Sequence, residues 1–391
     1  LLPAAHLQDR VVTQSLENYS VGEAKLIASE NDYSFLHLIN PELDNPYLRG
    51  TRQELVFKKI NENLDSFLDK KVLVRCTEPS IFIYRVEHDG LTQTGIWTIT
   101  HIDDYLCGKI KKHEHTVARR ERLLADYLQQ TRLDANPVLI TYPSDTRVEK
   151  LISRYTTDTS PILDFKFADH SHHQLWQVSD NEDLNLLVDV FGSLSCVYIA
   201  DGHHRIASAA KLKTSPYFTS VYMNTQEIEI LEFNRLVRNL GSVTADELLL
   251  QVREVFDVEE KTEGLKPGRL HEIGMYIDHQ WYLLKPKKGV YDEADPVSGL
   301  DVSILQSTIL APILGINDPR TDARITFSGG RTRVAELQKQ VDNGLFAIAF
   351  TLFPVSIEQL IAVADAEGIM PPKSTWIEPK FLVGLVTNYL S

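Results

Sequence analysis

The chain has 391 residues, of which 43% are hydrophobic and 24% charged, and its formal net charge is -14 at pH 7. This composition is that of an ordinary soluble globular protein, and the length leaves room for two or three domains. Surfaces that bind nucleic acids or anionic membranes need a basic footprint, so the acidic balance argues against both classes of partner. We therefore expect a small-molecule partner, with any anionic ligand held by a local cluster of basic side chains.

The cysteines and the longest apolar run indicate the cellular setting. The chain has three cysteines, Cys76, Cys107 and Cys196. Their odd number and wide spacing fit neither a disulfide framework nor a zinc knuckle. The longest apolar run, residues 345–355, falls well short of the roughly 20 residues that a membrane span needs. We therefore expect a cytoplasmic protein in which residues 345–355 form a core strand.

Helical and strand patterns alternate along the first 240 residues. The first 75 residues are mostly helical in pattern, and two β-rich runs, 81–87 and 91–101, flank the hairpin signal His88-Asp89-Gly90. The predicted segments that follow are helices at 117–130, 147–155, 181–191 and 206–213, and strands at 137–142, 162–167, 195–200 and 216–223. A hairpin followed by crossover-like segments predicts an α/β (α+β) fold with a mixed β-sheet and flanking helices.

The pattern changes near residue 241. The predicted elements beyond it are a helix at 245–255, a hairpin of 274–277 and 281–285, a helix at 302–314 and a helix opened by the capping box Ser356-x-x-Gln359. We therefore predict an α/β domain over 1–240 and a C-terminal α/β region over 241–391, which we expect to pack against the first.

The most unusual stretch is Asp201-Gly202-His203-His204-Arg205, between a predicted buried strand and a predicted helix. Asp201 or Gly202 is placed near the N-cap, where backbone N–H groups and the positive end of the helix dipole suit an anion. The structural alternative is that Asp201 only caps the helix, Gly202 only makes the turn and the histidines are solvated. Because a cap needs neither two consecutive histidines nor an arginine, we favour a ligand site.

A second polar stretch, His113-Glu114-His115-Thr116, precedes a helix whose first turn is basic and includes Arg122. In an extended segment His113 and His115 point to one side, and Thr116 is placed to cap the helix. The His-x-His pair suits metal chelation and Glu114 suits general-base chemistry, whereas the alternative is a polar helix entrance. A basic first turn opposes the helix dipole, which favours a nearby anion.

Two further stretches have polar groups in clusters. His170, His172 and His173 lie between a predicted strand and a predicted helix, where they suit either a metal or a ligand contact or a solvated loop. The segment Met370-Pro371-Pro372-Lys373-Ser374-Thr375 joins two prolines to three side-chain donors and is typical of a rigid loop that presents donors to an anion. It is equally compatible with a plain loop.

Taken together, these motifs resemble a bacterial and archaeal family known as domain of unknown function ten-fifteen. The matching features, in chain order, are HEHT at 113–116, Arg122, the run 137–142, His173 with Trp176, ADGHHR at 200–205 and MPPKST at 370–375. The resemblance extends from about Ala24 to Leu390. The chain departs from the family at Phe233-Asn234-Arg235, where many members have a histidine before the arginine.

The DGHHR turn is also similar to the phosphate-binding turn of the ParB and sulfiredoxin superfamily, which includes free-serine kinases. This resemblance implies a ParB/sulfiredoxin-like core, bound nucleotide (ATP or ADP) with Mg²⁺, and phosphoryl transfer to a small hydroxyl-bearing metabolite such as serine. It adds no DNA-binding inference, because the sequence has no evident basic patch or helix-turn-helix.

The residues to which we assign roles in that chemistry form two sets. The phosphate- or nucleotide-binding set is Gly202, His203, His204, Arg205, His113, His115, Thr116, Arg122, Lys373, Ser374 and Thr375. The catalytic set is Asp201, Glu114, His203 and His204, in which Asp201 or Glu114 binds Mg²⁺ or accepts the hydroxyl proton.

Two alternatives remain for the function. One is a metal-dependent hydrolase with Zn²⁺ on His113, His115 and either His203 or His204, and with Glu114 as the base. The other is a ligand-sensing protein without chemistry.

Overall fold

The computed structural model describes residues 1–50, 52–212 and 215–390, which form two compact units. The first unit comprises Leu1–Lys111, Thr116–Ile228 and Pro379–Ser391, and the second comprises Lys112–His115 and Glu229–Glu378. This division differs from the predicted boundary at 240. The reason is non-local pairing, since the strands that begin at Glu229 pair with strands of the second unit and the last residues return to the first.

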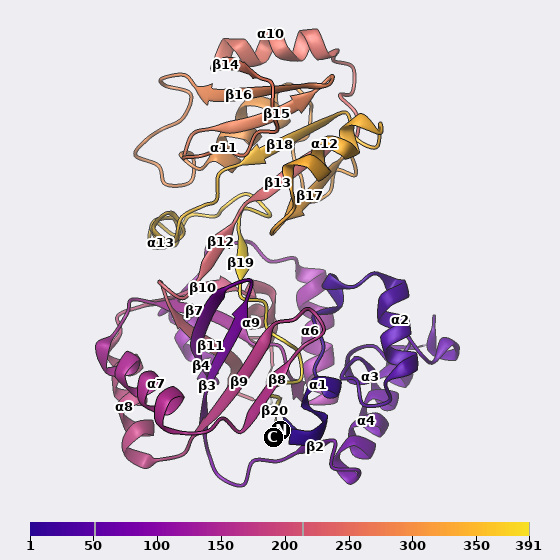
Figure 1. Ribbon diagram of the computed structural model, residues 1–391, viewed down its shortest axis with the longest axis vertical. Coiled ribbons are helices and arrows are strands. Elements are labelled where there is room, and N and C mark those ends of the chain that lie inside the picture. Colours follow the sequence, from indigo (N-terminus) through magenta and orange to yellow (C-terminus); the bar gives the residue numbers. More distant parts are fainter. Residues whose placement is uncertain (51, 213–214, 391) are drawn as a thin grey trace. The chain divides into compact units, whose positions relative to one another are not determined.

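The first unit contains a mixed eight-stranded sheet in the order β5-β10-β7-β11-β4-β3-β9-β8 (Figure 1). Its strands are β3 Ile81–His88, β4 Leu91–His101, β5 Ile110–Lys111, β7 Val138–Tyr142, β8 Leu163–Lys166, β9 His172–Val178, β10 Val197–Asp201 and β11 Tyr217–Asn224. β7 and β11 are parallel, as are β5 and β10, while the other pairs are antiparallel. The predicted mixed sheet is confirmed.

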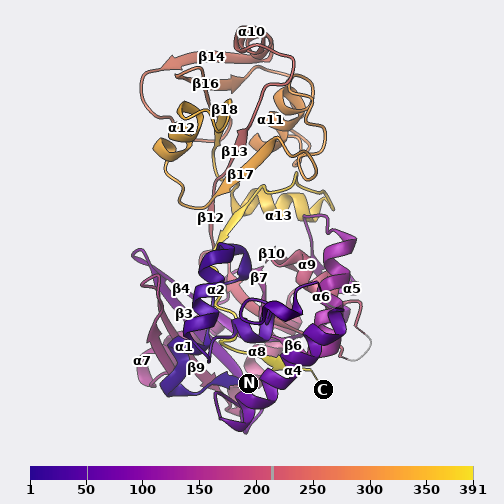
Figure 2. The same ribbon diagram turned by 90° about the vertical axis from the view of Figure 1, so that its right-hand side faces the viewer.

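Helices surround this sheet. They are α1 Gln8–Val11, α2 Val21–Glu30, α3 Leu36–Ile39, α4 Gln53–Asp69, α5 Asp103–Leu106, α6 Ala118–Thr131, α7 Thr146–Asp158, α8 Asn181–Ser193 and α9 His203–Ala209, with short 3-10 turns at Ala5–Leu7, Leu16–Asn18 and Pro46–Leu48. Figure 1 shows α7 and α8 side by side. Val148 and Leu151 of α7 and Leu187 and Val190 of α8 belong to the main core of the unit. Figure 2 shows α4 and α6 in a separate helical layer around Phe35, Ile60 and Leu64.

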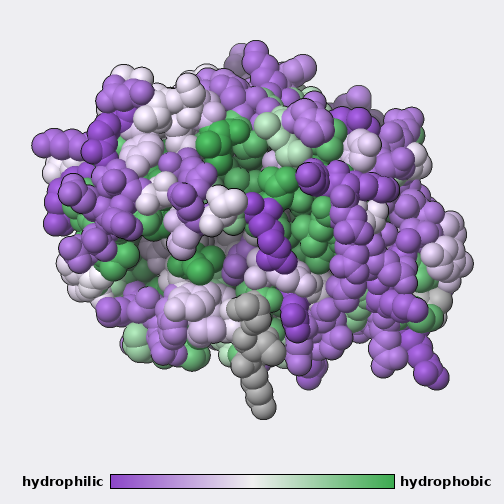
Figure 3. Space-filling view, turned by 90° about the horizontal axis from the view of Figure 1, so that it is seen from below, coloured by the Kyte–Doolittle hydropathy of each residue, from purple (hydrophilic) through white to green (hydrophobic). Residues whose placement is uncertain are grey.

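The start and the end of the chain meet in the first unit. β1 Leu2–Pro3 pairs with β2 Leu73–Val74, and β20 Asn388–Tyr389 pairs with β6 Leu133–Asp134. The N-terminal ammonium of Leu1 donates to the Thr387 carbonyl at 2.7 Å. Figure 3 shows that this end is mostly hydrophilic, with apolar side chains gathered near the middle of the face.

The second unit contains an antiparallel six-stranded sheet in the order β14-β16-β15-β18-β13-β17. Its elements are β12 Glu229–Leu231, β13 Phe233–Val237, α10 Ala245–Val255, β14 Phe256–Lys261, β15 Ile273–Ile277, β16 Gln280–Pro286, α11 Asp301–Leu305, a π-helical turn at Gln306–Leu310, β17 Ile325–Gly329, α12 Val334–Asp342, β18 Ile348–Leu352, α13 Ile357–Asp365 and β19 Trp376–Glu378. β12 and β19 form a separate two-stranded sheet.

Local sequence signals account for many of these boundaries. Asp89 and Gly90 both have positive φ, as the tight turn between β3 and β4 requires. The predicted capping box at Ser356 and Gln359 opens α13. The predicted strand at 345–355 is confirmed in its middle, where β18 is fully buried. The helix predicted at 206–213 begins earlier, at His203, and Lys213 lies outside the described residues.

Candidate functional site

The DGHHR stretch forms the predicted strand-to-helix turn. β10 ends at Asp201, and Gly202 is the N-cap of α9 with φ of 101°. A Cβ at Gly202 would lie 2.8 Å from Nε of Arg205, so both the backbone angle and the space require glycine. The side chains of Asp201 and Arg205 are thereby brought to the same side of the turn.

Asp201 lies among positive charges. Its Oδ2 accepts a charged hydrogen bond from Nη2 of Arg205, and its Oδ1 lies 3.9 Å from Nζ of Lys380. Desolvation raises the pKa of this carboxyl, but attraction by Lys380, Arg205 and His203 outweighs it and holds the pKa well below its usual range. The side chain of Asp201 is still 41% exposed, so an ionised carboxylate faces solvent beside two cations.

Arg205 is held in place by the protein. Its Nη1 donates to Oδ1 of Asn136 and to the Pro137 carbonyl, in addition to the Nη2 bond to Asp201. A guanidinium has five N–H donors, so two remain after these three bonds within the described residues. The fork is therefore both a structural tie and a preorganised donor for an anion.

A small cavity of about 100 Å³ is lined in part by Arg205, Asp134 and Thr219. Burial raises the pKa of Asp134 to about 6, although hydrogen bonds from Thr219 and the charge of Arg205 oppose the rise. The Thr219 amide donates to Oδ2 of Asp134 at 2.6 Å. This carboxyl supports the strand that carries Thr219.

The two histidines of the turn have different surroundings. His203 is buried, with 5% exposure. His204 accepts the Val117 amide hydrogen at Nε2 over 3.0 Å, which places the proton of a neutral ring on Nδ1. Val117 is the N-cap of α6, so the prediction that Thr116 caps this helix is wrong.

The Thr116 hydroxyl instead donates to Glu121 of α6, and Glu121 also pairs with Lys211. The hydrogen bond from Lys211, and to a smaller extent the one from Thr116, lowers the pKa of Glu121, although partial desolvation opposes this shift. Glu121 thereby supplies the negative charge that the basic first turn of α6 needs. Arg122 is exposed on the same helix.

His113, Glu114 and His115 belong to the second unit, together with the MPPKST loop. The His113 carbonyl accepts the Met370 amide hydrogen at 2.9 Å. A bend at Glu114 separates a buried His113, 2% exposed, from an exposed His115, so the predicted arrangement of both histidines on one side of an extended segment is wrong.

The MPPKST loop is tied to a buried arginine. Nη2 of Arg235 donates to the carbonyls of Pro372 and Lys373 at 3.4 and 2.9 Å, and burial lowers the pKa of Arg235 to about 9. Ser374, also buried, donates its hydroxyl to the Pro371 carbonyl at 2.6 Å.

The other two donors of the loop are more accessible. Lys373 is exposed with φ of 57°, and its Nζ lies 5.7 Å from the ring centroid of Phe233. Thr375 is half-buried. Hydrogen bonds to its carbonyls thus anchor the loop. Ser374 has an internal bond, and Lys373 and Thr375 are the donors that remain toward solvent.

The third histidine cluster is part of a hairpin, so the predicted loop leading into a helix is wrong. His170 lies at the turn with φ of 66°, and β9 begins at His172, whose Nε2 lies 2.7 Å from Oδ1 of Asp164. His173 is buried between the Tyr84 hydroxyl at 2.8 Å and the Ser171 hydroxyl at 2.6 Å. These rings have structural partners.

The inference from sequence missed Lys380 and Asn136. Lys380 comes from the last segment of the chain and approaches Asp201 only after that segment returns to the first unit. Asn136 directly precedes the predicted strand 137–142, and no local pattern marked it as a partner of Arg205. In the described parts of the chain, no three His, Cys, Asp or Glu side chains are grouped to hold a metal ion. None of the helices described is long and apolar enough to cross a membrane.

Solved structures of distant sequence resemble the chain. A free serine kinase mutant in complex with ADP has 12% sequence identity and a TM-score of 0.41, over 73% of this chain and 88% of that one. SbnI from Staphylococcus aureus with a C-terminal truncation has 12% identity and a TM-score of 0.41, over 74% and 87%. A conserved hypothetical protein from Pyrococcus furiosus has 11% identity and a TM-score of 0.39, over 73% and 91%.

No curated protein matches the sequence. One family does, and its match extends over residues 1–303, which include HEHT and DGHHR. The chain therefore belongs to the family described as "Protein of unknown function (DUF1015)".

Proposed function

We propose that the chain binds a nucleotide or another phosphorylated ligand at the DGHHR turn and transfers a phosphoryl group to a small hydroxyl-bearing metabolite such as serine. The observation that supports this proposal most is the charge arrangement at the turn, where Arg205 and Lys380 lie beside the half-exposed carboxylate of Asp201. Two cations against one carboxylate leave a local positive excess in a chain whose net charge is -14.

Phosphate oxygens suit this arrangement. The Arg205 fork is preorganised by Asn136 and the Pro137 carbonyl and offers planar donors, while Lys380 adds a point charge on a flexible stem. Donors that are fixed before the reaction stabilise developing charge without reorganisation. His203 and His204, the other predicted phosphate ligands of the turn, stay predictions.

The lowered pKa of Asp201 supports the role of metal ligand that we propose for it. A general base works best with a pKa near the working pH, so an aspartate held well below its usual range is a poor base and a good permanent anion. Mg²⁺ in kinases is held by one or two carboxylates together with phosphate oxygens, and Asp201 fits such a ligand. Bound there, the ion would neutralise charge on the transferred group.

In the proposed transfer, the acceptor hydroxyl oxygen attacks the terminal phosphorus, the bond from that phosphorus to its bridging oxygen breaks, and the nucleoside diphosphate leaves with that electron pair. The acceptor proton passes to solvent or to a carboxylate. Glu114 and the remaining predicted ligands His113, His115, Thr116, Arg122, Lys373, Ser374 and Thr375 stay predictions.

The test is a phosphoryl-transfer assay. Purified chain, ATP and Mg²⁺ are incubated with serine and a panel of small alcohols, and the products are followed by phosphorus NMR. We expect a phosphate ester with at least one acceptor and a loss of transfer rate of about 100-fold or more in Asp201→Asn, the scale seen when one preorganised electrostatic group of an active site is removed. Nucleotide binding without transfer to any acceptor would contradict the catalytic part and favour a ligand-sensing protein.

A further inference from the structure

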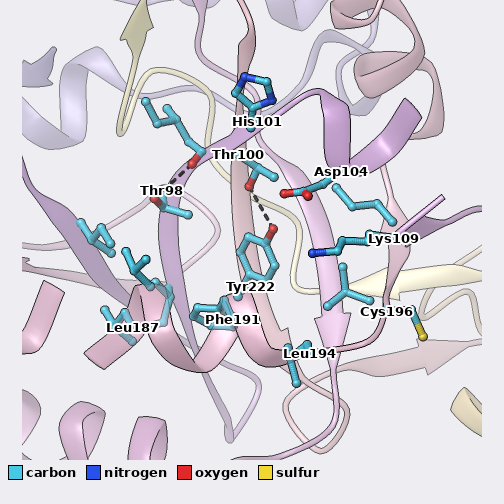
Figure 4. A pocket seen from close by; sticks show the side chains of 17 residues that line it. Thr98, Thr100, His101, Asp104, Lys109, Leu187, Phe191, Leu194, Cys196 and Tyr222 are labelled. Atoms are coloured by element: carbon cyan, nitrogen blue, oxygen red, sulfur yellow. Dashed lines mark hydrogen bonds between the residues drawn. The ribbon is translucent and has the colours of Figure 1, made fainter. Parts of the chain in front are cut away.

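A second cavity lies in the first unit, away from the DGHHR turn. It has a volume of about 320 Å³ and opens between β4, α5, α8 and the start of β10 (Figure 4). Cys196 and Val197 line it, whereas Asp201 ends β10, which places the turn about 13 Å further along the strand at 3.3 Å per residue. The cavity is therefore separate from the proposed phosphate site.

The floor of the cavity is apolar. Ile96, Leu187, Phe191 and Val197 contribute side chains that belong to or pack against the main core of the unit. Two large apolar side chains remain exposed at its rim, Ile99 at 47% and Val188 at 64%. The volume lies at the lower end of the range of roughly 300–1,000 Å³ typical of small-molecule pockets. An apolar body of modest size would bury this surface.

One end of the cavity is polar. The Thr100 hydroxyl is bonded to the Tyr222 hydroxyl at 3.0 Å and to Ser220 at 2.7 Å, which fixes the positions of these hydroxyl groups. Burial and then the nearby charge of Asp104 raise the pKa of Tyr222 to about 12, so its hydroxyl stays protonated. Figure 4 shows the hydroxyls of Thr98, Thr100 and Tyr222 on neighbouring strands at this end.

A carboxylate and an ammonium group flank these hydroxyls. Figure 4 shows the side chains of Asp104 and Lys109 directed toward Thr100 and Tyr222. Within the described residues, neither the Asp104 carboxylate nor the Lys109 ammonium has a hydrogen bond or an ion pair with a protein side chain. Opposite charges at one polar end, above an apolar floor, match a ligand that carries both charges on one small head.

We propose that this cavity binds an apolar α-amino acid, with its carboxylate on Lys109, its ammonium group on Asp104 and its side chain on the floor formed by Leu187 and Phe191. The Thr100 and Tyr222 hydroxyls would complete the contacts to the head group. Serine, the acceptor named under the proposed function, would leave the apolar floor uncovered and is expected to bind this cavity at least tenfold more weakly than leucine.

The test is isothermal titration of the full chain with L-leucine, L-phenylalanine and L-serine. Two truncated probes, 4-methylpentanoate without the amine and isopentylamine without the carboxylate, report each charge separately. We expect saturable binding of leucine or phenylalanine and a loss of about tenfold or more with each truncated probe, since charged hydrogen bonds contribute at least that much.

Substitutions at Asp104 and Lys109 test whether leucine binds in this cavity. Asp104→Asn should weaken leucine binding about tenfold or more and Lys109→Met likewise, while leaving the far-ultraviolet circular dichroism unchanged because both side chains are partly or fully exposed. Asp103→Asn is the matched control, since Asp103 precedes Asp104 on α5, is exposed and does not line the cavity. Equal leucine affinity in all three variants, or no binding of any apolar amino acid, would overturn the proposal.

The outcome is independent of the proposed phosphate site. Asp201→Asn should bind leucine as the unchanged chain does, because Asp201 does not line this cavity. Loss of leucine binding in Asp201→Asn would also contradict a separate site.

Discussion

Asp201, Arg205 and Lys380 place three charges at one turn, but these side chains do not contribute equally to the stability of the fold. Arg205 has three protein acceptors and a side chain only 22% exposed, so it stabilises the fold as well as the turn. Lys380 has a 33% exposed side chain that lies 3.9 Å from Asp201. Substitutions at these two positions should therefore separate stability from ligand affinity.

Arg205→Lys should destabilise the chain by about 1–3 kcal/mol, because one ammonium group cannot reach Asn136, Pro137 and Asp201 together and each lost bond costs about 0.5–1.5 kcal/mol. Urea denaturation followed by circular dichroism measures this change. An unchanged midpoint would show that the guanidinium network contributes nothing to stability.

His173 should make the stability of the chain fall on mild acidification. Burial, opposed by the charge of Asp169 and reinforced by His172 and His88, lowers the pKa of His173 from 6.5 to about 4. In the unfolded chain the imidazole is protonated below pH 6.5, whereas in the folded chain it stays neutral until about pH 4. Unfolding therefore takes up a proton between these values, and this contribution to stability is lost as pH falls from 6.5 to 4.

The loss attributable to His173 is about 3 kcal/mol at 1.36 kcal/mol per pKa unit. His173→Gln keeps a donor and an acceptor for Tyr84 and Ser171 and removes the titration. Between pH 7 and pH 4, the unfolding free energy of the unchanged chain should therefore fall by about 3 kcal/mol more than that of His173→Gln. The comparison uses urea titrations at each pH. A difference that does not vary with pH would contradict a buried neutral histidine.

At the scale of single elements, the turn between β10 and α9 depends on Gly202. Its positive φ is one that side chains rarely adopt, and a Cβ would also press on the Arg205 guanidinium. Gly202→Ala should cost about 1–3 kcal/mol. Gly192→Ala in α8 is the matched control, because a Cβ there meets nothing within 4 Å and alanine favours a helix by about 1 kcal/mol. Thermal denaturation compares them, and equal stability would refute the strained turn.

The elements also show how far the sequence alone predicts this fold. Periodicity and caps are local, so the β3–β4 hairpin, α6, α7, α8, α10 and the opening of α13 lie close to their predicted positions. Sheet order is non-local, so the division of the structure at Glu229 differs from the predicted boundary at 240, and the β8–β9 hairpin was missed.

In the candidate site, too, local features could be predicted from the sequence and non-local contacts could not. The turn residues Asp201 to Arg205 are contiguous and could be predicted from their local pattern. Lys380 and Asn136 reach them only through tertiary structure, and His113 next to the bend at Glu114 bonds to the distant Met370, so none of these features could be predicted from residue spacing.

At the scale of the whole molecule, the last segment of the chain completes the first unit. Phe381 packs edge-on against Tyr84 and Trp97, with ring centroids 5.8 and 5.7 Å apart, and Val383 is buried in the core with Phe35. Leu382, Leu385, Val386 and Leu390 are buried as well.

Deletion of residues 379–391 should therefore prevent the first unit from folding stably. Removal of a large core side chain costs about 2–5 kcal/mol, and several of them exceed the 5–15 kcal/mol that usually separates folded from unfolded states. The single substitution Phe381→Ala should cost about 3–5 kcal/mol and leave the chain folded. Calorimetric melting compares the three proteins, and a truncated chain with the full melting transition would contradict this role.

The central claim is that the DGHHR turn holds phosphate with the help of Lys380. Calorimetric titration of ATP and ADP with Mg²⁺ into the unchanged chain, Lys380→Gln and Lys58→Gln tests it most directly. Lys58, an exposed residue of α4, is the control for the loss of one positive charge. We predict nucleotide binding by the unchanged chain and by Lys58→Gln, and about tenfold or greater weakening in Lys380→Gln with the melting temperature retained. Absence of nucleotide binding, or equal affinity in all three proteins, would contradict the claim.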